Sequence, residues 1–235
     1  MTAGVIAAAR LYADEVLADA PQVFLQLDES SGTTASDTSG NSRNGTYEGT
    51  YTLAATSLIR DGGAALDVNN GGVVVADGAY LDVTSVTVGA WVVADTLTGT
   101  DNLRIIASRY STGTPISYHW HMSALGSKAF FRAWAGGAAR DAMGATTLTT
   151  GVVYHVAATW DGSTARVYLN GALDGSSATS AQTLNTGDIP VRIGRLSNAG
   201  AGISTYAWDG RVDGFALYGS ALSVERIRAH YAAGL

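Results

Sequence analysis

Oxygen-bearing side chains recur at alternate positions in the segment 36–46. Asp37, Ser39 and Asn41 supply a carboxylate, a hydroxyl and an amide oxygen, and Asn44 adds a further amide. Calcium binds about six to eight hard oxygen atoms and accepts backbone carbonyls from glycine-rich loops of this kind. The segment therefore predicts a structural calcium site. The alternative is a solvated loop that is held by Asx turns and binds no ion.

A second candidate site combines aromatic and polar side chains on two neighbouring strands. Tyr118 and Trp120 alternate with two histidines in one strand, and Arg132 and Trp134 share a face of the next. Sugars stack their C–H faces on aromatic rings and accept hydrogen bonds from arginine, so these four residues could line a glycan groove. The alternative is that both Trp side chains fill the core. The histidines lack a third metal ligand and are predicted to lie on the strand surface.

Catalytic motifs are scarce in this sequence. Glycoside hydrolysis needs two carboxyl groups about 5–10 Å apart. Glu15, Glu29, Glu48 and Glu225 are the glutamates of the chain, and they place no pair on one strand. A Gly-x-Ser-x-Gly elbow, a cysteine and a phosphate-binding glycine loop before a helix are also missing. We expect recognition without catalysis, with a hydrolase built from distant aspartates as the alternative.

Composition restricts the partners of the chain. Its 14 Lys and Arg residues against 20 Asp and Glu give a net charge of −6, and a nucleic-acid binder would need a clustered basic face. No apolar run approaches the roughly 20 residues that span a bilayer. Cysteine is absent, so the chain has no disulfide framework. The length of 235 residues suits one large domain.

The elements that must position these residues are predicted to be strands. Val153–Trp160 and Thr164–Leu169 alternate apolar and polar residues, with an Asp161-Gly162 turn between them and Asn170-Gly171 after them. Asp-Gly and Asn-Gly supply the positive φ angles of two-residue hairpin turns. Further strands are expected at 22–27, 72–76, 86–94, 103–108, 116–123, 129–134, 189–194 and 207–218.

Helices are expected at both ends. The segment 2–18 is Ala-rich, carries an apolar stripe that includes Val16 and Leu17, and ends before Pro21. The stripe is too apolar for a solvated leader, and so short a helix is marginal alone. We therefore expect residues 1–20 to dock on a partner during assembly; docking on the sandwich is the alternative.

The other end of the chain is predicted to close the main domain. Ser223 can cap a helix over 223–233 that carries apolar residues on one face, with Gly234 as its stop. The strands and this helix together predict a β-sandwich domain over 21–235, preceded by the separate helical segment 1–20.

Several stretches resemble one fold family. The order of an apolar strand, Trp160-Asp161-Gly162, a second strand and Leu169-Asn170-Gly171 resembles the laminin-G-like members of the concanavalin A-like family. The segment 208–218 resembles the family's closing strand, and 30–49 and 63–75 resemble its opening strands. The resemblance implies an all-β, concanavalin A-like (laminin-G-like) jelly-roll sandwich with short N- and C-terminal helices.

The same resemblance implies a ligand and a metal. Members of the family recognise carbohydrates or protein surfaces, often with calcium. Relatives with a similar Asp-x-Ser-Gly-Asn loop complete the calcium site with an aspartate of the closing strand, which is Asp213 here. The implied ligands are thus Asp37, Asn41, Asp213 and loop carbonyls.

The start of the chain also resembles minor tail or receptor-binding proteins of actinobacterial phages. The resemblance lies in the helix up to Pro21 and in the Leu-Asp-Glu-Ser-Ser-Gly-Thr segment that ends at Thr33. It implies a virion protein that binds host surface polysaccharide or glycoprotein and contacts other tail subunits, with a homotrimer as the first expectation. The absence of a recognisable secretory signal fits. The alternatives are a structural decoration protein of the virion, and an extracellular bacterial lectin or enzyme-appended module.

Overall fold

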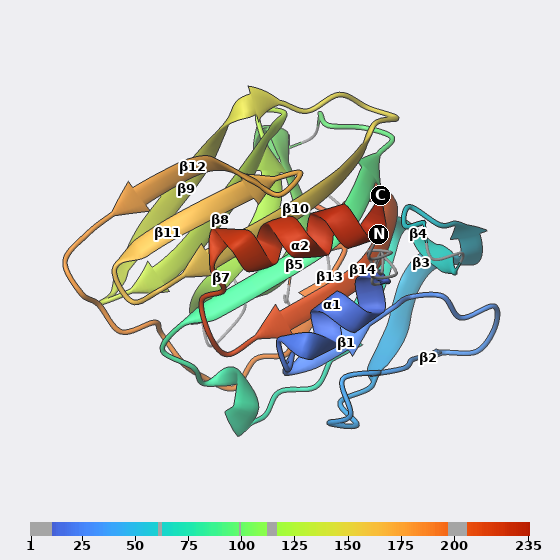
Figure 1. Cartoon of the computed structure of the whole chain (residues 1–235), viewed down its shortest axis with the longest axis horizontal. Helices are drawn as coiled ribbons and strands as arrows, with labels where there is room; N and C mark the ends of the chain where they lie inside the picture. Colours follow the sequence, from blue (N-terminus) through green and yellow to red (C-terminus); the bar gives the residue numbers. More distant parts are fainter. Residues whose placement is uncertain (1–10, 61–62, 99, 112–116, 197–205) are drawn as a thin grey trace, which may run out of the picture.

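The structure, a computed structural model, describes residues 11–60, 63–98, 100–111, 117–196 and 206–235 (Figure 1). Its helices are α1 (Tyr12–Ala18) and α2 (Val224–Gly234). Short 3-10 turns lie at Ala79–Leu81 and Thr100–Asn102. The strands are β1 (Val23–Leu25), β2 (Thr34–Ala35), β3 (Gly45–Thr56), β4 (Ala64–Val75), β5 (Val86–Ala94), β6 (Leu103–Ser111), β7 (Ser117–Leu125), β8 (Lys128–Ala135), β9 (Ala138–Thr147), β10 (Val153–Trp160), β11 (Thr164–Leu169), β12 (Ala172–Ala178), β13 (Val191–Ile193) and β14 (Asp209–Tyr218).

The strands form a continuous antiparallel sheet that folds back on itself. Its order is β12-β11-β10-β5-β14-β4-β13-β6-β7-β8-β9, with β1 beside β14 and β3 beside β4. The two ends of this order meet, because Thr146 of β9 donates its hydroxyl to Asp174 of β12 at 2.6 Å. The main core fills the space between the two layers and includes Trp120, Trp160 and Trp208. This architecture confirms the predicted all-β sandwich with short terminal helices.

The β10–β11 hairpin follows the predicted strand bounds, but its first turn differs by one residue. Gly162 has φ +97°, and Asp161 donates its N–H to the carbonyl oxygen of Thr164. The two central residues are therefore Gly162 and Ser163, with Gly162 at the position that requires a positive φ. The carboxylate of Asp161 accepts hydrogen bonds from the N–H groups of Ser163 and Thr164 instead of occupying the turn itself. The second turn is as predicted, with positive φ at Asn170 and Gly171.

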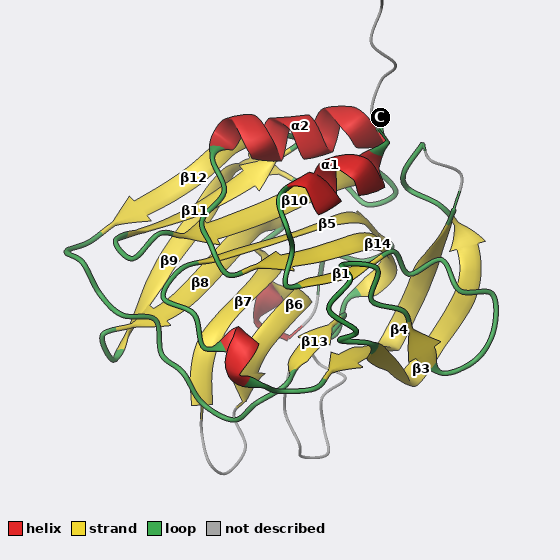
Figure 2. Cartoon of the chain, turned by 60° about the horizontal axis from the view of Figure 1, so that its bottom comes forward, coloured by secondary structure: helices red, strands yellow, loops and turns green. Residues whose placement is uncertain are grey.

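Helix α1 covers the sheet of its own chain (Figure 2). Tyr12 and Val16 are buried in a second apolar cluster, outside the main core, together with Phe24, Trp91 and Tyr218. The Tyr12 hydroxyl also donates to the carbonyl oxygen of Gly214 at 2.8 Å.

The predicted helix over 2–18 is therefore found at Tyr12–Ala18, and residues 1–10 lie outside the described part. Docking on a partner is wrong for its inner face, because the outer surface of β5 and β14 already covers that face. A role of residues 1–20 in assembly stays a prediction. None of the described helices is long and apolar enough to cross a membrane.

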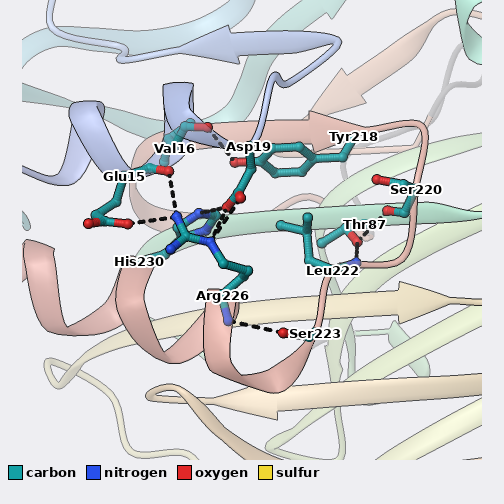
Figure 3. A network of polar contacts seen from close by, with 10 residues as sticks. All are labelled: Glu15, Val16, Asp19, Thr87, Tyr218, Ser220, Leu222, Ser223, Arg226 and His230. Carbon is teal, nitrogen blue, oxygen red and sulfur yellow. Dashed lines mark hydrogen bonds and ion pairs between the residues drawn. The ribbon is translucent and has the colours of Figure 1, made fainter.

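An ionic clasp joins α1 to α2 (Figure 3). The Arg226 guanidinium binds Asp19 through Nε at 2.8 Å and Glu15 through Nη2 at 2.6 Å. His230 Nε2 lies 2.7 Å from the other oxygen of Asp19. Arg226 of α2 thus binds both Glu15, in the last turn of α1, and Asp19, the residue that follows this helix.

The start of α2 confirms the predicted cap. Ser223 accepts a hydrogen bond from the N–H of Arg226, and Ile227 is buried one turn later. Thr87 of β5 fixes the approach, because its hydroxyl donates to the carbonyl oxygen of Ser220 and accepts from the N–H of Leu222 (Figure 3).

We expect Arg226→Ala to lower the free energy of unfolding by about 1–2 kcal/mol, because charge-assisted hydrogen bonds are lost at a site that solvent partly screens. Arg228→Ala is the matched control, since Arg228 is exposed on the same helix, and it should change stability by less than about 0.5 kcal/mol. Urea unfolding of the three proteins measures both values. Equal stability of the two variants would contradict the clasp.

Candidate functional site

Aromatic rings gather on the outer face of β6, β7 and β8, on the opposite side of these strands from the main core. Tyr110 of β6 stacks on Trp134 of β8, with ring centroids 4.9 Å apart and planes at 30°. His121 of β7 lies between them in the sheet, 5.9 Å from Tyr110 and 5.8 Å from Trp134. Trp134 is half-buried, so part of this aromatic surface faces solvent.

A paired charge borders the rings. Arg132 of β8 lies opposite Asp141 of β9 in the strand register. Its Nε and Nη2 atoms donate to the two oxygens of Asp141 at 2.6 and 2.5 Å. The guanidinium lies 5.4 Å from the ring centroid of Trp134. Both charged side chains remain more than one-third exposed, at 34% and 39%. We refer to Tyr110, His121, Arg132, Trp134 and Asp141 as the aromatic face.

His121 forms a neutral part of this face. Burial, together with a smaller effect of the neighbouring Arg132, lowers the pKa of His121 to about 3. Its Nδ1 atom lies 3.2 Å from the Ser123 hydroxyl. The prediction that both histidines of this strand lie on the surface is wrong, because His119 and His121 are buried under neighbouring side chains. At neutral pH His121 acts as a flat packing surface, without charge.

The structure separates the four residues that the sequence grouped together. Arg132 and Trp134 lie on the aromatic face as predicted, but Trp120 is 2% exposed and belongs to the main core. Trp120 pairs with Ala133, which puts it on the opposite side of the sheet from Trp134. The prediction that Trp120 binds a ligand is therefore wrong. Tyr118 lies in β7, and its side chain falls outside the described part.

Tyr110 was missed by sequence reasoning. Alternation along β6 puts Tyr110 on the same face as Ser108, whose strand partner is His121, and so beside Trp134. The predicted strand ended at residue 108, so the aromatic type of Tyr110, just beyond that strand, was the available signal.

The carboxylate of Asp37 is already surrounded by donors of its own loop. It accepts hydrogen bonds from the N–H groups of Phe24, Ser39 and Arg43 at 2.8–3.0 Å and from the Ser39 hydroxyl at 2.8 Å. Burial raises the pKa of Asp37, but these hydrogen bonds outweigh burial and leave the pKa below its usual value. Asn41 donates through its amide to the carbonyl oxygens of residues 21 and 22. Donors directed at the Asp37 carboxylate take the place that a cation would occupy, and the Asn41 amide is itself engaged as a donor.

Asp213 belongs to a different network. It accepts from the Ser57 hydroxyl at 2.9 Å and from the N–H of Leu58 at 2.8 Å. It is 3% exposed and lines a cavity of about 100 Å³ together with Tyr12 and Asp28. Burial raises the pKa of Asp213 to about 6, against an opposing effect of its hydrogen bonds.

The predicted calcium ligands therefore do not fit one site. Asp213 shares none of its hydrogen-bond partners with Asp37 or Asn41. Among the described residues, no group of three or more His, Asp or Glu side chains could hold a metal ion. Calcium binding stays a prediction from the sequence that these contacts do not support.

Comparisons with known proteins place the fold. The family model described as the concanavalin A-like lectin/glucanases superfamily matches residues 67–228. No curated protein matches the chain significantly in sequence.

Solved structures share the fold at low identity. The binding domain of Paraclostridial Mosquitocidal Protein 1 has a TM-score of 0.68 and 16% identity over 92% of this chain and 52% of that one. The binding domain of botulinum neurotoxin DC, solved with rat synaptotagmin II, has a TM-score of 0.66 and 14% identity over 93% and 52%. This chain thus spans about half the length of these toxin domains.

A third similar structure has nearly the same extent as this chain. It is domain 4 of AbnA, an extracellular GH43 arabinanase from Geobacillus stearothermophilus, in complex with arabinotriose. Its TM-score is 0.58 and its identity 17%, over 90% of this chain and 98% of that one. At such identities the likeness shows the fold alone.

We expect Asp213 to make stability depend on pH. Its pKa is raised in the folded state from 3.8 to about 6, so its contribution is present below the unfolded pKa and is lost as the pH rises through about 6. The stability difference between the protein and Asp213→Asn should shift by about 2 kcal/mol in favour of the variant between pH 4 and 7. Because the buried histidines are common to both proteins, their titration cancels. Thermal unfolding at several pH values measures the difference, and a constant difference would refute the ionisation of Asp213.

Proposed function

The chain belongs to the concanavalin A-like lectin/glucanases superfamily, and on that premise we propose that it is a recognition module that binds a glycan without cleaving it. The observation that carries the proposal is the aromatic face, where the half-buried Trp134 stacks on Tyr110 beside the exposed Arg132–Asp141 pair. Aromatic surface with a few fixed polar groups is the usual composition of a ligand site.

The aromatic face offers each type of contact that a sugar ring uses. The Trp134 ring presents an apolar surface for the C–H groups. The Nη1 atom of Arg132 does not take part in its two bonds to Asp141, which use Nε and Nη2. Nη1 can therefore donate to a ring hydroxyl, and the outer lone pairs of Asp141 can accept from a neighbouring hydroxyl. The ion pair holds both groups in place before the ligand arrives, which lowers the entropic cost of binding.

Similar structures support a glycan as the ligand class. The AbnA domain was solved with arabinotriose, and a botulinum neurotoxin DC binding domain was solved in complex with SialylT. The same neurotoxin domain was also solved with rat synaptotagmin II, a protein partner. A host surface polysaccharide or glycoprotein is accordingly the ligand class that we propose here.

The biological setting of the proposal rests on the sequence. The resemblance to actinobacterial phage tail proteins supports a virion protein in contact with other tail subunits, and a homotrimer is the assembly that we propose. A structural decoration protein would share the fold and would lack glycan affinity. Binding of purified protein to host cell-wall polysaccharide separates these two functions.

We expect Trp134→Ala to weaken glycan binding about fivefold to tenfold, because a stacking contact contributes about 1 kcal/mol or slightly more. Arg132→Ala should weaken it at least as much, since it removes a donor and releases Asp141. Leu173→Ala is the matched control, because Leu173 is 52% exposed on β12 and lies outside the aromatic face. A glycan array identifies the ligand and calorimetry measures the affinities. Unchanged affinity of both site variants would contradict the proposed site.

We also expect no glycosidase activity. Asp141 is the carboxylate of the aromatic face, and both of its oxygens are bound by Arg132. A hydrolase would need a second carboxyl group at about 5–10 Å, in addition to one that can exchange protons. The assay incubates the pure protein with the glycan identified on the array and measures reducing ends. Release of reducing sugar above the level given by heat-denatured protein would refute the prediction.

A further inference from the structure

Two arginines share one carboxylate oxygen at the end of β13, away from the aromatic face. Arg192 donates through Nε to Oε1 of Glu48 at 2.7 Å, and Arg195 donates through Nε to the same oxygen at 2.8 Å. The Nη2 atom of Arg195 also contacts this oxygen. The side chains of Arg192, Arg195 and Glu48 are 14%, 13% and 26% exposed. We refer to these three residues as the arginine–glutamate cluster.

The cluster lies on the side of its strands that faces away from the main core. Val191 and Ile193 belong to the main core, so Arg192 between them points to the other side of β13. Glu48 comes from β3, and β4 separates β3 from β13 in the sheet. The cluster therefore joins two strands that do not pair with each other.

The charges of the cluster do not balance. Two guanidinium groups bind one carboxylate, and neither arginine pairs with another acidic residue of the described part. The segment 197–205, which follows the cluster in sequence, contains no acidic residue either. One arginine alone can pair with a carboxylate through two hydrogen bonds. The second arginine thus leaves an excess positive charge at a place that solvent reaches only in part, and an anion would compensate this charge.

The cluster also keeps polar atoms available for a ligand. Nη1 and Nη2 of Arg192 and Nη1 of Arg195 have no hydrogen-bond partner among the described residues. Oε2 of Glu48 has none there either, because both arginines bind Oε1. These atoms are not sealed from solvent, unlike the buried unpaired atoms of Trp91 and His155. The cluster therefore presents guanidinium donors and one carboxylate acceptor to a ligand that arrives from solvent.

We propose that the arginine–glutamate cluster binds a hydrogen phosphate group. The guanidinium groups donate to the phosphate oxygens, a geometry that suits arginine. The P–OH group donates to Oε2 of Glu48. This contact selects the ligand, because a sulfate ion has no proton to donate and its oxygens are repelled by the carboxylate. The site is independent of glycan binding, since it shares no residue with the aromatic face.

The probe is inorganic phosphate, titrated at pH 7.5 into the ¹⁵N-labelled protein and followed through the Nε–H signals of Arg192 and Arg195. Arg192→Lys and Arg195→Lys assign these signals by their disappearance. We expect phosphate to move the signals in a saturable way in the millimolar range. Sulfate, which has the same shape and nearly the same charge, should bind about tenfold more weakly, because a hydrogen bond to a charged carboxylate is lost.

Glu48→Gln tests the selection, because it preserves the shape of the side chain and removes the charge that repels sulfate. We expect sulfate to bind about tenfold more tightly to this variant and the preference for phosphate to disappear. Arg192→Ala should weaken phosphate binding about tenfold, whereas Arg228→Ala, which removes an exposed cation of α2, should not change it. The comparison of phosphate with sulfate on the unaltered protein keeps the test decisive if a variant fails to fold.

Glucose 6-phosphate distinguishes free phosphate from phosphate on a sugar. Its ester group has a second pKa of about 6, so about half of the molecules carry the required proton at pH 6. At that pH, an affinity at least equal to that of inorganic phosphate assigns the site to a phosphorylated sugar, and a weaker affinity assigns it to free phosphate. Three results overturn the proposal: signals that phosphate does not move, equal affinity for phosphate and sulfate at pH 7.5, or an equal loss of affinity in Arg192→Ala and Arg228→Ala.

Discussion

Burial of β5 on both of its faces is the constraint on which the rest of the structure depends. Every residue of Val86–Ala94 is buried. One face, with Val88 and Val92, fills the main core, and Trp91 on the other face lies in the second apolar cluster. An antiparallel sheet can leave one face to water only if that face is polar. The outer face here is aromatic, so α1 and α2 must cover it, and the Arg226 clasp holds the two helices in that position.

The covered and uncovered layers explain where ligands can bind. Above β5 and β14 the helices α1 and α2 cover the apolar surface. In the part of the chain that the structure describes, the layer formed by β6–β9 has no helix over its outer face, where aromatic rings alternate with the Arg132–Asp141 pair. This face tolerates solvent because its charges satisfy each other and burial keeps His121 neutral. The proposed glycan surface lies on β6–β9, and the described helices cover the opposite layer.

The sequence predicted the strands that carry their own local signals. The bounds of β5, β10 and β11 agree residue for residue, because alternation, β-branched residues and glycine turns coincide there. Strands β9 and β12 were missed: Ala138–Thr147 and Ala172–Ala178 are rich in small and polar residues. Pairing with β8 and β11 makes them strands, and strand propensity depends on such neighbours. Helix α1 was expected to dock on a partner, with the sandwich as the alternative; it covers the sandwich, because Phe24, Trp91 and Tyr218 from three strands together form an apolar outer surface.

The candidate sites were harder to predict because they depend on register and on competing donors. Alternation places Trp120 and Trp134 on opposite faces once β7 and β8 are paired, and a shift of one residue would have exchanged them. The oxygens of Asp37 resemble metal ligands in sequence, yet backbone N–H groups that no sequence pattern displays already satisfy them. Trp91 is the reverse case: it lies in an apolar strand, yet its N–H has no partner among the described residues, at a cost of about 1–3 kcal/mol. The same indole ring packs against Tyr12 of α1 and Tyr231 of α2. These contacts with both helices offset the cost of the unpaired donor, which therefore follows from how β5 is covered.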